Sequence, residues 1–432
     1  MEENTISNKD PLDASRKLGI SLASELGQKT MEELEQAFAT RLLPRFSDDP
    51  ITRTNQNILC YWQFGYYKST ILKVFSQTIP QDNCKTVDIS SMTLEKVFGS
   101  IDEKKNRIIA PAFTNDIKIV TISELAAFLG KQDVKQFANV MNLALENERI
   151  CRQTLKLGYG QIDNQQLFEL KAKGVAYDPA AGELSYVPNV CVFAATRPLD
   201  GPTFTYLSKS GYFSRYHVLQ FNIDDQEVSE HLHQDFIIDQ DTLNLLKQIN
   251  QKLSSVKVQK VKRPPPSLMK EIYDAVEDIV RDEISNDPRR KLSEVINPRL
   301  KGDIIREIIG HCFLRIASQN DYRDIEIVEC NEEDAHFILG RIYHFVNFAL
   351  KPLIAEDITT RTMMRSKKDQ TIGAILDFLS DGAEHSRKEV LQYVQGKINI
   401  STAMTDIVLK ELLTERTIQQ PSFGFYKSEG GV

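Results

Sequence analysis

The sequence has no long apolar run and no paired-cysteine motif. Its apolar runs are short, as in Val190–Ala195, whereas a membrane-spanning helix needs roughly 20 such residues. The six cysteines include no CxxC pair, which argues against a zinc ribbon or a disulfide scaffold and predicts small buried residues. The acidic N-terminus lacks the pattern of a signal peptide. We therefore expect a cytoplasmic protein without a membrane segment.

The chain also has no excess of positive charge. Its 53 lysines and arginines are outnumbered by 60 aspartates and glutamates, so the formal net charge is −7. Any nucleic-acid surface must therefore come from local basic patches. The remaining composition, 41% hydrophobic and 26% charged, is that of an ordinary globular protein. With 432 residues, the chain is long enough for two or three domains.

Short apolar strands alternate with helices from residue 57 to about residue 223. This alternation predicts an α/β fold with a parallel sheet covered on both faces. We expect this core over residues 51–255, after an extension over residues 1–50 that is helical in parts. The expected strands are Ile58–Tyr61, Thr86–Ile89, Ile117–Ile122, Val190–Ala194 and His217–Phe221.

Two breaks divide the rest of the chain. The first, VKVQKVKRPPPS, contains three consecutive prolines, which favour extended backbone. Residues 267–357 then show helical spacing throughout. The second break, TTRTMMRSKKD, precedes three short predicted helices and a two-stranded hairpin, TIQQP with FGFYKS. That layout is typical of a winged helix-turn-helix module.

The most distinctive local feature is ILCYWQFGYYKSTILKVF, a strand and turn followed by Lys68 and Ser69 at a helix start. A lysine there can reach the β and γ phosphates of a nucleotide, and the hydroxyl beside it can bind Mg²⁺. The P-loop pattern also has two glycines, where this chain has Trp62 and Tyr67 and keeps only Gly65. On these residues alone, a Lys-Ser pair that merely starts a helix remains an alternative.

Polar residues follow the later strands in an order that favours a ligand site at the carboxyl edge of the sheet. Glu124 follows the strand in KIVTISEL, where a carboxylate can polarise an attacking water. Thr196 and Arg197 follow the strand in VCVFAATRPLDG. Arg215 precedes the next strand, and Arg299 begins a later helix. Each arginine taken alone is equally a surface charge, so the order of these residues carries the signal.

In the order of these elements, residues 58–346 resemble the AAA+ module of the minichromosome maintenance (MCM) helicases. AATRP lies where that family has sensor 1, FSRYHV where it has the arginine finger, and NPRLKGDIIREIIGHCFLR where it has the sensor 2 helix. The resemblance implies that ATP and Mg²⁺ are bound, with Ser69 on the metal and Glu124 as general base. It implies that Arg215 and Arg299 act on a nucleotide held by a neighbouring subunit. The implied nucleotide contacts are Gly65, Lys68, Ser69, Thr70, Thr196 and Arg197.

The sequence departs from the family at several positions. The Walker B aspartate is Ser123, the sensor 1 asparagine is Arg197, and two P-loop glycines are absent. The N-terminal zinc and OB-fold tier has no counterpart in the first 50 residues. On the resemblance, residues 51–255 are the AAA+ core, residues 256–360 the linker and helical lid with sensor 2, and residues 361–432 a basic linker and winged-helix domain.

The resemblance makes DNA the expected partner and a homo-oligomer, most simply a hexameric ring, the expected assembly. A DNA-bound ring would be associated with the nucleoid. The last long predicted helix has a net charge unfavourable to DNA, so docking of a replication protein is an equal alternative for the winged helix. The basic residues expected to contact DNA are Arg152, Lys156, Lys171, Lys173, Arg365, Lys367, Lys368 and Lys410.

Two functions remain open at this point. One is an MCM-like ATPase that oligomerises on DNA and drives or assists unwinding or replication, including that of a mobile element. The other is an assembly scaffold that binds DNA or a partner with little or no ATP turnover. The altered P-loop and Ser123 favour the scaffold, whereas the retained Glu124, Arg215 and Arg299 favour the ATPase.

Overall fold

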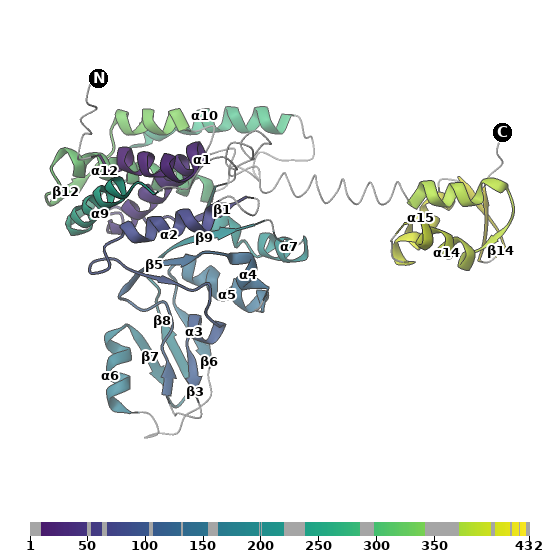
Figure 1. The fold of residues 1–432 in the computed structure, drawn as a ribbon, viewed down its shortest axis with the longest axis horizontal. Helices are drawn as coiled ribbons and strands as arrows, with labels where there is room; N and C mark the ends of the chain where they lie inside the picture. Colours follow the sequence, from purple (N-terminus) through teal and green to yellow (C-terminus); the bar gives the residue numbers. More distant parts are fainter. Residues whose placement is uncertain are drawn as a thin grey trace. The chain divides into compact units, whose positions relative to one another are not determined.

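The chain forms two compact units, Met1–Lys351 and Pro352–Val432. In the described ranges, no helix is long and apolar enough to cross a membrane. The computed structural model (Figure 1) describes residues 10–49, 53–62, 67–102, 107–130, 133–153, 163–197, 199, 201–219, 238–285, 298–341, 371–398, 402–414, 417–422 and 424–428.

A five-stranded parallel sheet lies at the centre of the first unit (Figure 1). All five predicted strands are confirmed to within two residues at the ends described. Residues 220 and 221 of the last predicted strand lie outside the described residues. The sheet order is β10-β1-β9-β5-β2, with β1 (Ile58–Tyr61), β2 (Lys85–Asp88), β5 (Ile117–Ile122), β9 (Cys191–Thr196) and β10 (His217–Leu219).

Strand β9 shows how both faces of the sheet are covered. All its side chains are buried, as expected of a central parallel strand. Phe193 packs against Phe75 of α2 (Lys68–Thr78), with ring centroids 5.9 Å apart. Val192 points to the opposite face, where it shares a core with Phe128 of α4 (Leu125–Leu129) and Phe137 of α5 (Val134–Leu145).

The strand order makes β1 a switch point. The connection after β1 runs through α2 to β2 at one edge of the sheet, whereas the connections after β2, β5 and β9 run the opposite way. Right-handed crossovers therefore place α2 on one face and α4, α5 and α7 (Gly201–Lys209) on the other. In open α/β sheets, ligands bind at the carboxyl ends of the strands beside such a reversal.

Helix α1 (Pro11–Leu42) covers the α2 face together with α9 (Gln240–Ser255). Its two ends lie side by side: Ser15 Oγ donates a 3.3 Å hydrogen bond to Glu35, and Arg16 pairs with Glu32. The segment therefore folds back on itself. The two arms touch where Gly19 meets Gly27. A Cβ at Gly19 would lie 2.3 Å from the Gly27 carbonyl oxygen, so only glycine permits this approach.

We expect Gly19→Ala to lower the free energy of unfolding by about 1–3 kcal/mol, because the added methyl forces the arms apart. Gly340→Ala is the matched control, since a Cβ there meets nothing within 4 Å and alanine favours the helix. Urea unfolding of both variants measures the difference. Equal stability of the two variants would contradict the close approach.

Glu35 of α1 is completely buried and accepts a 3.2 Å hydrogen bond from Asn250. Burial raises its pKa from 4.5 to about 8, so the folded chain keeps a proton that the unfolded chain releases. The contribution of Glu35 to the free energy of unfolding should therefore be greatest below about pH 4.5. It should fall by about 1.4 kcal/mol per pH unit up to about pH 8.

We expect Glu35→Gln to remove this part of the pH dependence, so that the variant gains stability over the parent as pH rises. Thermal unfolding at several pH values between about 5 and 8 measures the two slopes. Glu326→Gln, at an exposed position, should follow the parent. Parallel curves for Glu35→Gln and the parent would show that Glu35 titrates normally.

The prediction that residues 267–357 are helical throughout is wrong. α10 (Pro266–Ser285), α12 (Pro298–Gln319) and residues 332–341 are helical, but β12 (Ile325–Val328) lies between them. It pairs in parallel with β11 (Val258–Val261), inside the segment interpreted as a linker. The sequence gives little warning, because a four-residue strand fits both helical and extended periodicity.

The described residues between Ile150 and Tyr186 contain a helix and a three-stranded antiparallel sheet. Its order is β6-β8-β7, with β6 (Ile150–Gln153), β7 (Val175–Asp178) and β8 (Glu183–Tyr186), and α6 (Asn164–Ala172) precedes β7. Nearby are α3 (Leu94–Phe98) and the hairpin of β3 (Ser100–Asp102) with β4 (Arg107–Ile109).

The second unit contains the three predicted helices and the predicted hairpin. Residues 371–378 are helical and continue into η3 (Leu379–Asp381); α14 (Arg387–Lys397) and α15 (Thr402–Thr414) follow. β14 (Ile418–Ser422) and β15 (Phe425–Ser428) form the hairpin, and β13 (His385–Ser386) adds a third strand. A capping box between Ser386 and Glu389 starts α14. Buried Ile375, Leu379, Val390, Val394, Val408 and Leu412 belong to its core.

Candidate functional site

Lys68 begins α2, and its ammonium turns back toward the end of β1. Nζ donates a 2.8 Å hydrogen bond to the Trp62 carbonyl and lies 5.3 Å from the centroid of the Trp62 ring. The side chain is buried. Burial lowers the pKa of Lys68 to about 8, although the charge of Glu124 acts in the opposite direction. A desolvated ammonium of this kind interacts strongly with an anion that replaces water.

Tyr67, directly before Lys68, has φ of +51° and ψ of 2°. This left-handed conformation costs a non-glycine residue roughly 1–2 kcal/mol. Glycine is the residue that usually adopts it, and the P-loop pattern has glycine at this position. The backbone at Tyr67 therefore has a conformation that favours glycine, although the residue is a tyrosine. Gly65 lies outside the described residues.

A chain of hydrogen bonds joins the start of α2 to the ends of β5 and β2. Ser69 Oγ donates to the Ser123 carbonyl at 2.5 Å, and Ser123 Oγ donates to Asp88 Oδ2 at 2.7 Å. Ser90 Oγ accepts from the Ser123 backbone N–H at 2.6 Å and donates to Asp88 Oδ1 at 2.5 Å. The carboxylate of Asp88 therefore lies beside Ser123, between the ends of β2 and β5.

Sequence reasoning missed Asp88 and Ser90. The signal was present, because Asp88 lies near the end of a predicted strand, as Glu124 lies just past another. The hydroxyl and carboxylate oxygens of Ser69, Ser123, Asp88 and Glu124 are hard donors of the kind that Mg²⁺ prefers. This donor set fits a magnesium ion.

Glu124 follows β5 and occupies the N-cap position of α4. Its Oε1 is buried and has no hydrogen-bond partner among the described residues. Leaving a buried carboxylate oxygen unsatisfied is costly, and such groups concentrate at functional sites. The charge of Glu124 is felt at Lys68, so the two side chains belong to one electrostatic site.

Strand β9 brings Thr196 to the same edge, because Thr196 is the register partner of Tyr61 in β1. Thr196 is buried, and its hydroxyl donates to the Arg197 carbonyl at 2.9 Å. Arg197 is exposed. Thr70 follows Ser69 in α2 and is half-buried.

The residue predicted to be an arginine finger lies at the other edge of the sheet. Arg215 ends η2 (Phe213–Arg215), immediately before the amino end of β10. Its Nε is 3.0 Å from Glu146, and Nη1 donates to the Gly211 carbonyl at 2.5 Å. The guanidinium therefore points away from the Lys68 site of its own chain. Arg299 lies in the first turn of α12, but its side chain is outside the described residues.

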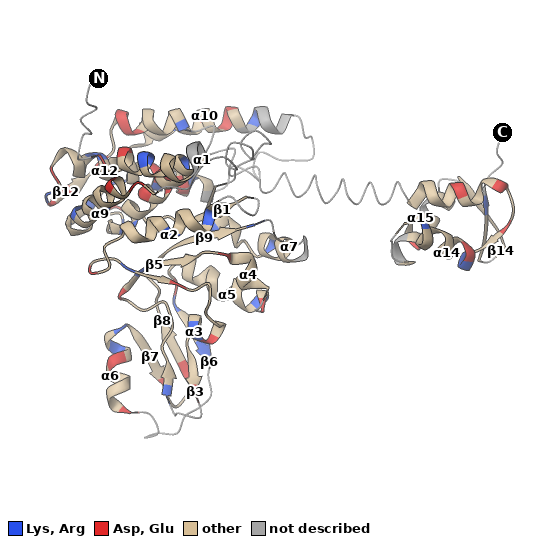
Figure 2. Ribbon diagram, viewed as in Figure 1, with Lys and Arg blue, Asp and Glu red and all other residues tan. Residues whose placement is uncertain are grey.

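The residues expected to contact DNA are dispersed. Arg152 donates to the Gly99 carbonyl at 2.9 Å and lies over the Phe98 ring, so it is held against its own unit. Lys171 and Lys173, at the end of α6, and Lys410 on α15 are exposed. Figure 2 shows acidic and basic residues interspersed along α1 and α10. Lys156, Arg365, Lys367 and Lys368 lie outside the described residues.

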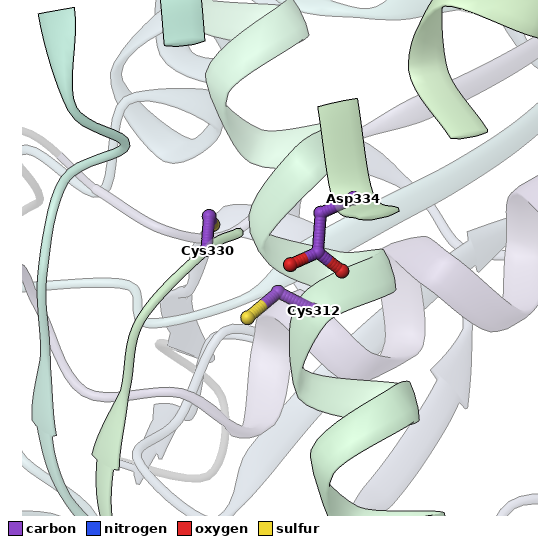
Figure 3. Close-up of side chains that lie close together, drawn as sticks. All are labelled: Cys312, Cys330 and Asp334. Atoms are coloured by element: carbon purple, nitrogen blue, oxygen red, sulfur yellow. The ribbon is translucent and has the colours of Figure 1, made fainter. Parts of the chain in front are cut away.

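Cys312, Cys330 and Asp334 lie close together (Figure 3), with ligand atoms within 4.8 Å of one another. Arg315 and His311 already bind the carboxylate, with Arg315 Nη2 2.8 Å from Oδ2 and His311 Nδ1 2.8 Å from Oδ1. Burial alone would raise the Asp334 pKa, but the hydrogen bonds of His311 and Arg315 lower it to about 2. An ion pair that joins two helices explains this cluster better than a metal.

The predicted burial of the cysteines is confirmed for Cys60, Cys84, Cys191, Cys312 and Cys330 and is wrong for Cys151. Cys151 is exposed. It lies on β6, where alternate side chains point to opposite faces, and its neighbour Ile150 is buried. The apolar character of a cysteine therefore did not decide its position.

A cavity of about 460 Å³ lies beside the carboxyl end of β10. Leu219 lines it and is the register partner of Cys60 in β1, so the cavity is one strand away from the segment that leads to Lys68. Gln28 of α1 and Phe337 of the 332–341 helix also line it. The rest of its wall is largely charged, with Arg16, Lys29, Glu32, Glu33, His336 and Arg341.

The structure thus brings Lys68, Ser69, Glu124 and Thr196 to the carboxyl edge of the sheet and leaves Arg215 at the amino edge. Comparison with known proteins does not identify a family for the chain. No protein-family model matches the chain, and no curated protein matches it.

Proposed function

We propose that the chain is an AAA+ protein, resembling the motor half of an MCM helicase, that binds ATP with Mg²⁺ at the carboxyl edge of its sheet. One observation carries the proposal. Lys68 begins the helix that follows the switch strand β1, and its desolvated ammonium lies within electrostatic range of Glu124 at the end of β5. The start of α2 adds a favourable field for phosphate, because backbone N–H groups point toward a ligand at a helix N-terminus.

Each residue has a role that follows from its position. Lys68 exchanges the Trp62 carbonyl for phosphate oxygens, and the Ser69 hydroxyl exchanges the Ser123 carbonyl for the metal. Bound Mg²⁺ neutralises charge on the phosphates. Asp88 holds the Ser123 hydroxyl in place at 2.7 Å, and Glu124 accepts a proton from the attacking water.

The proposed assembly is a homo-oligomeric ring, most simply a hexamer. Arg215 lies at the amino edge and can reach only a nucleotide held by a neighbouring copy. Arg299 would act in the same way. DNA is the proposed partner of the ring, through exposed Lys171 and Lys173 among others; such a complex would be associated with the nucleoid.

For the second unit, we propose a winged helix that docks a replication protein in preference to DNA. Arg387 forms a two-pronged ion pair with Asp406 of α15, at 2.8 and 2.6 Å. This pair satisfies the guanidinium that would otherwise meet a phosphate beside that helix. Lys410 is the exposed basic residue one turn further along α15.

ATP hydrolysis with and without single- and double-stranded DNA tests the proposal. The parent protein should hydrolyse ATP, DNA should raise the rate, and Lys68→Ala should remove activity. Lys73→Ala, an exposed lysine on the same helix, should behave as the parent does. Equal activity of the two lysine variants would exclude Lys68 from the site.

The second candidate function is a scaffold that assembles without turnover. Tyr67 in place of a P-loop glycine and the ion pair between Arg215 and Glu146 favour it. The same assay separates the candidates. A protein that forms oligomers but neither binds nor hydrolyses ATP would be this scaffold.

A further inference from the structure

A second cavity, of about 330 Å³, lies at the amino edge of the parallel sheet. It is lined by the segments that lead into three neighbouring strands: residues 53–55 before β1, Asn115 before β5 and residues 187–189 before β9. The end of α1 closes it with Arg41 and Arg45. The cavity therefore lies at the opposite edge from Lys68, which follows β1.

The charge of this cavity is of one sign. Arg41, Arg45 and Arg53 line it together with four asparagines, and none of the described residues that line it is an aspartate or a glutamate. Guanidinium groups gathered in a concave site with no carboxylate attract an anion. Asparagine amides supply further hydrogen-bond donors without adding charge.

Arg53 is the most informative of the three arginines. Its Nη1 is buried and has no hydrogen-bond partner in the part of the chain that the structure describes. Burial lowers the Arg53 pKa to about 10, even though the charges of Glu146 and Glu148 act to raise it. A buried guanidinium nitrogen without an acceptor is costly, and a bound oxyanion would remove that cost.

The rest of the cavity wall is already held in place. Arg41 donates to the Lys118 carbonyl at 3.2 Å and to the Asn189 carbonyl at 2.6 Å. Asn147 accepts from the Val190 N–H at 3.1 Å, and Asn55 donates to the Val190 carbonyl at 3.1 Å. The site is therefore preformed, so little ordering opposes ligand binding.

We infer that this cavity binds a small phosphate-bearing anion, with Arg53 as its principal ligand and Arg41 and Arg45 beside it. The planar guanidinium matches phosphate oxygens in a two-pronged geometry. A volume of about 330 Å³ admits inorganic phosphate or the phosphate end of a nucleotide. The site is separate from the proposed ATP site and does not depend on it.

Calorimetric titration of the full chain with inorganic phosphate and with ADP tests the inference. Phosphate should still bind Lys68→Ala, because Lys68 lies at the other edge of the sheet. Arg53→Gln should weaken phosphate binding by about 10–100-fold, the range expected for a charge-assisted hydrogen bond to a buried group. Arg323→Gln, at an exposed position, is the matched control and should bind as the parent does.

The two ligands identify the source of the phosphate. Binding of ADP by Lys68→Ala that is lost in the double variant with Arg53→Gln would identify a nucleotide phosphate. Binding of inorganic phosphate alone would identify the free anion. Both outcomes support the site.

Failure of phosphate to bind the parent at millimolar concentration, or equal binding by Arg53→Gln and the parent, would overturn the inference. Circular dichroism reports whether Arg53→Gln folds. If it does not, Arg45→Gln, at an exposed position, takes its place and should also weaken binding. Unchanged binding in that variant would overturn the inference equally.

Discussion

Glu124→Gln is expected to slow ATP hydrolysis by roughly 10²–10⁴-fold while nucleotide binding is retained. The amide fills the space of the carboxylate but cannot accept a proton from water. That proton would be received at the buried Oε1 of Glu124, which has no hydrogen-bond partner among the described residues. Single-turnover hydrolysis measures the chemical step, and equilibrium dialysis with ATP measures binding.

Glu332→Gln is the control for this variant, because Glu332 is exposed. It should leave both measurements unchanged. The Glu124→Gln protein should also hold ATP long enough to stabilise the oligomer, which light scattering detects. Hydrolysis by Glu124→Gln at the rate of the parent would show that another group is the base.

Arg215→Ala is expected to lower turnover by roughly 10³–10⁵-fold, the effect of losing an arginine finger, with little change in ATP affinity. The reason is positional: Arg215 lies at the amino edge of its own sheet, so in the proposed ring it would act on the site of the next copy. Steady-state hydrolysis and ATP dialysis on the same preparation measure both quantities.

Mixing two inactive proteins distinguishes action between copies from action within one. A ring that contains Arg215→Ala and Glu124→Gln copies has some interfaces with an intact Glu124 on one side and an intact Arg215 on the other. Activity should therefore reappear on mixing. Glu146→Gln, which removes the 3.0 Å partner of Arg215, should retain turnover. Mixtures that stay inactive would contradict a site shared between copies.

Most strands of the central sheet were predictable from the sequence because they are short apolar runs between polar segments; β2, KTVD, is the exception. The same reading found Lys68, Ser69 and Glu124, since each follows a strand at the edge where ligands bind. The positive φ of Tyr67 also follows from the pattern, because glycine is expected at that position.

Other features depend on contacts between distant segments. The pairing of β11 with β12 joins strands separated by α10 and α12. The sequence of neither strand indicates which strand it pairs with. The fold-back of α1 depends on the close approach of Gly19 to Gly27, which the sequence pattern does not indicate. The amino-edge cavity is lined by the end of α1 and by the segments that precede three strands. Its arginines therefore share no local sequence motif.

The most direct test of the central claim uses Trp62, the only tryptophan in the chain. Its ring centroid lies 5.3 Å from Lys68 Nζ, so phosphate that draws Lys68 away should change the tryptophan fluorescence. Titration with ATP and Mg²⁺ should give a saturable change in the parent and in Lys73→Ala, and none in Lys68→Ala. A parent whose fluorescence stays constant, and that binds no ATP in equilibrium dialysis, would contradict a nucleotide site at this edge of the sheet.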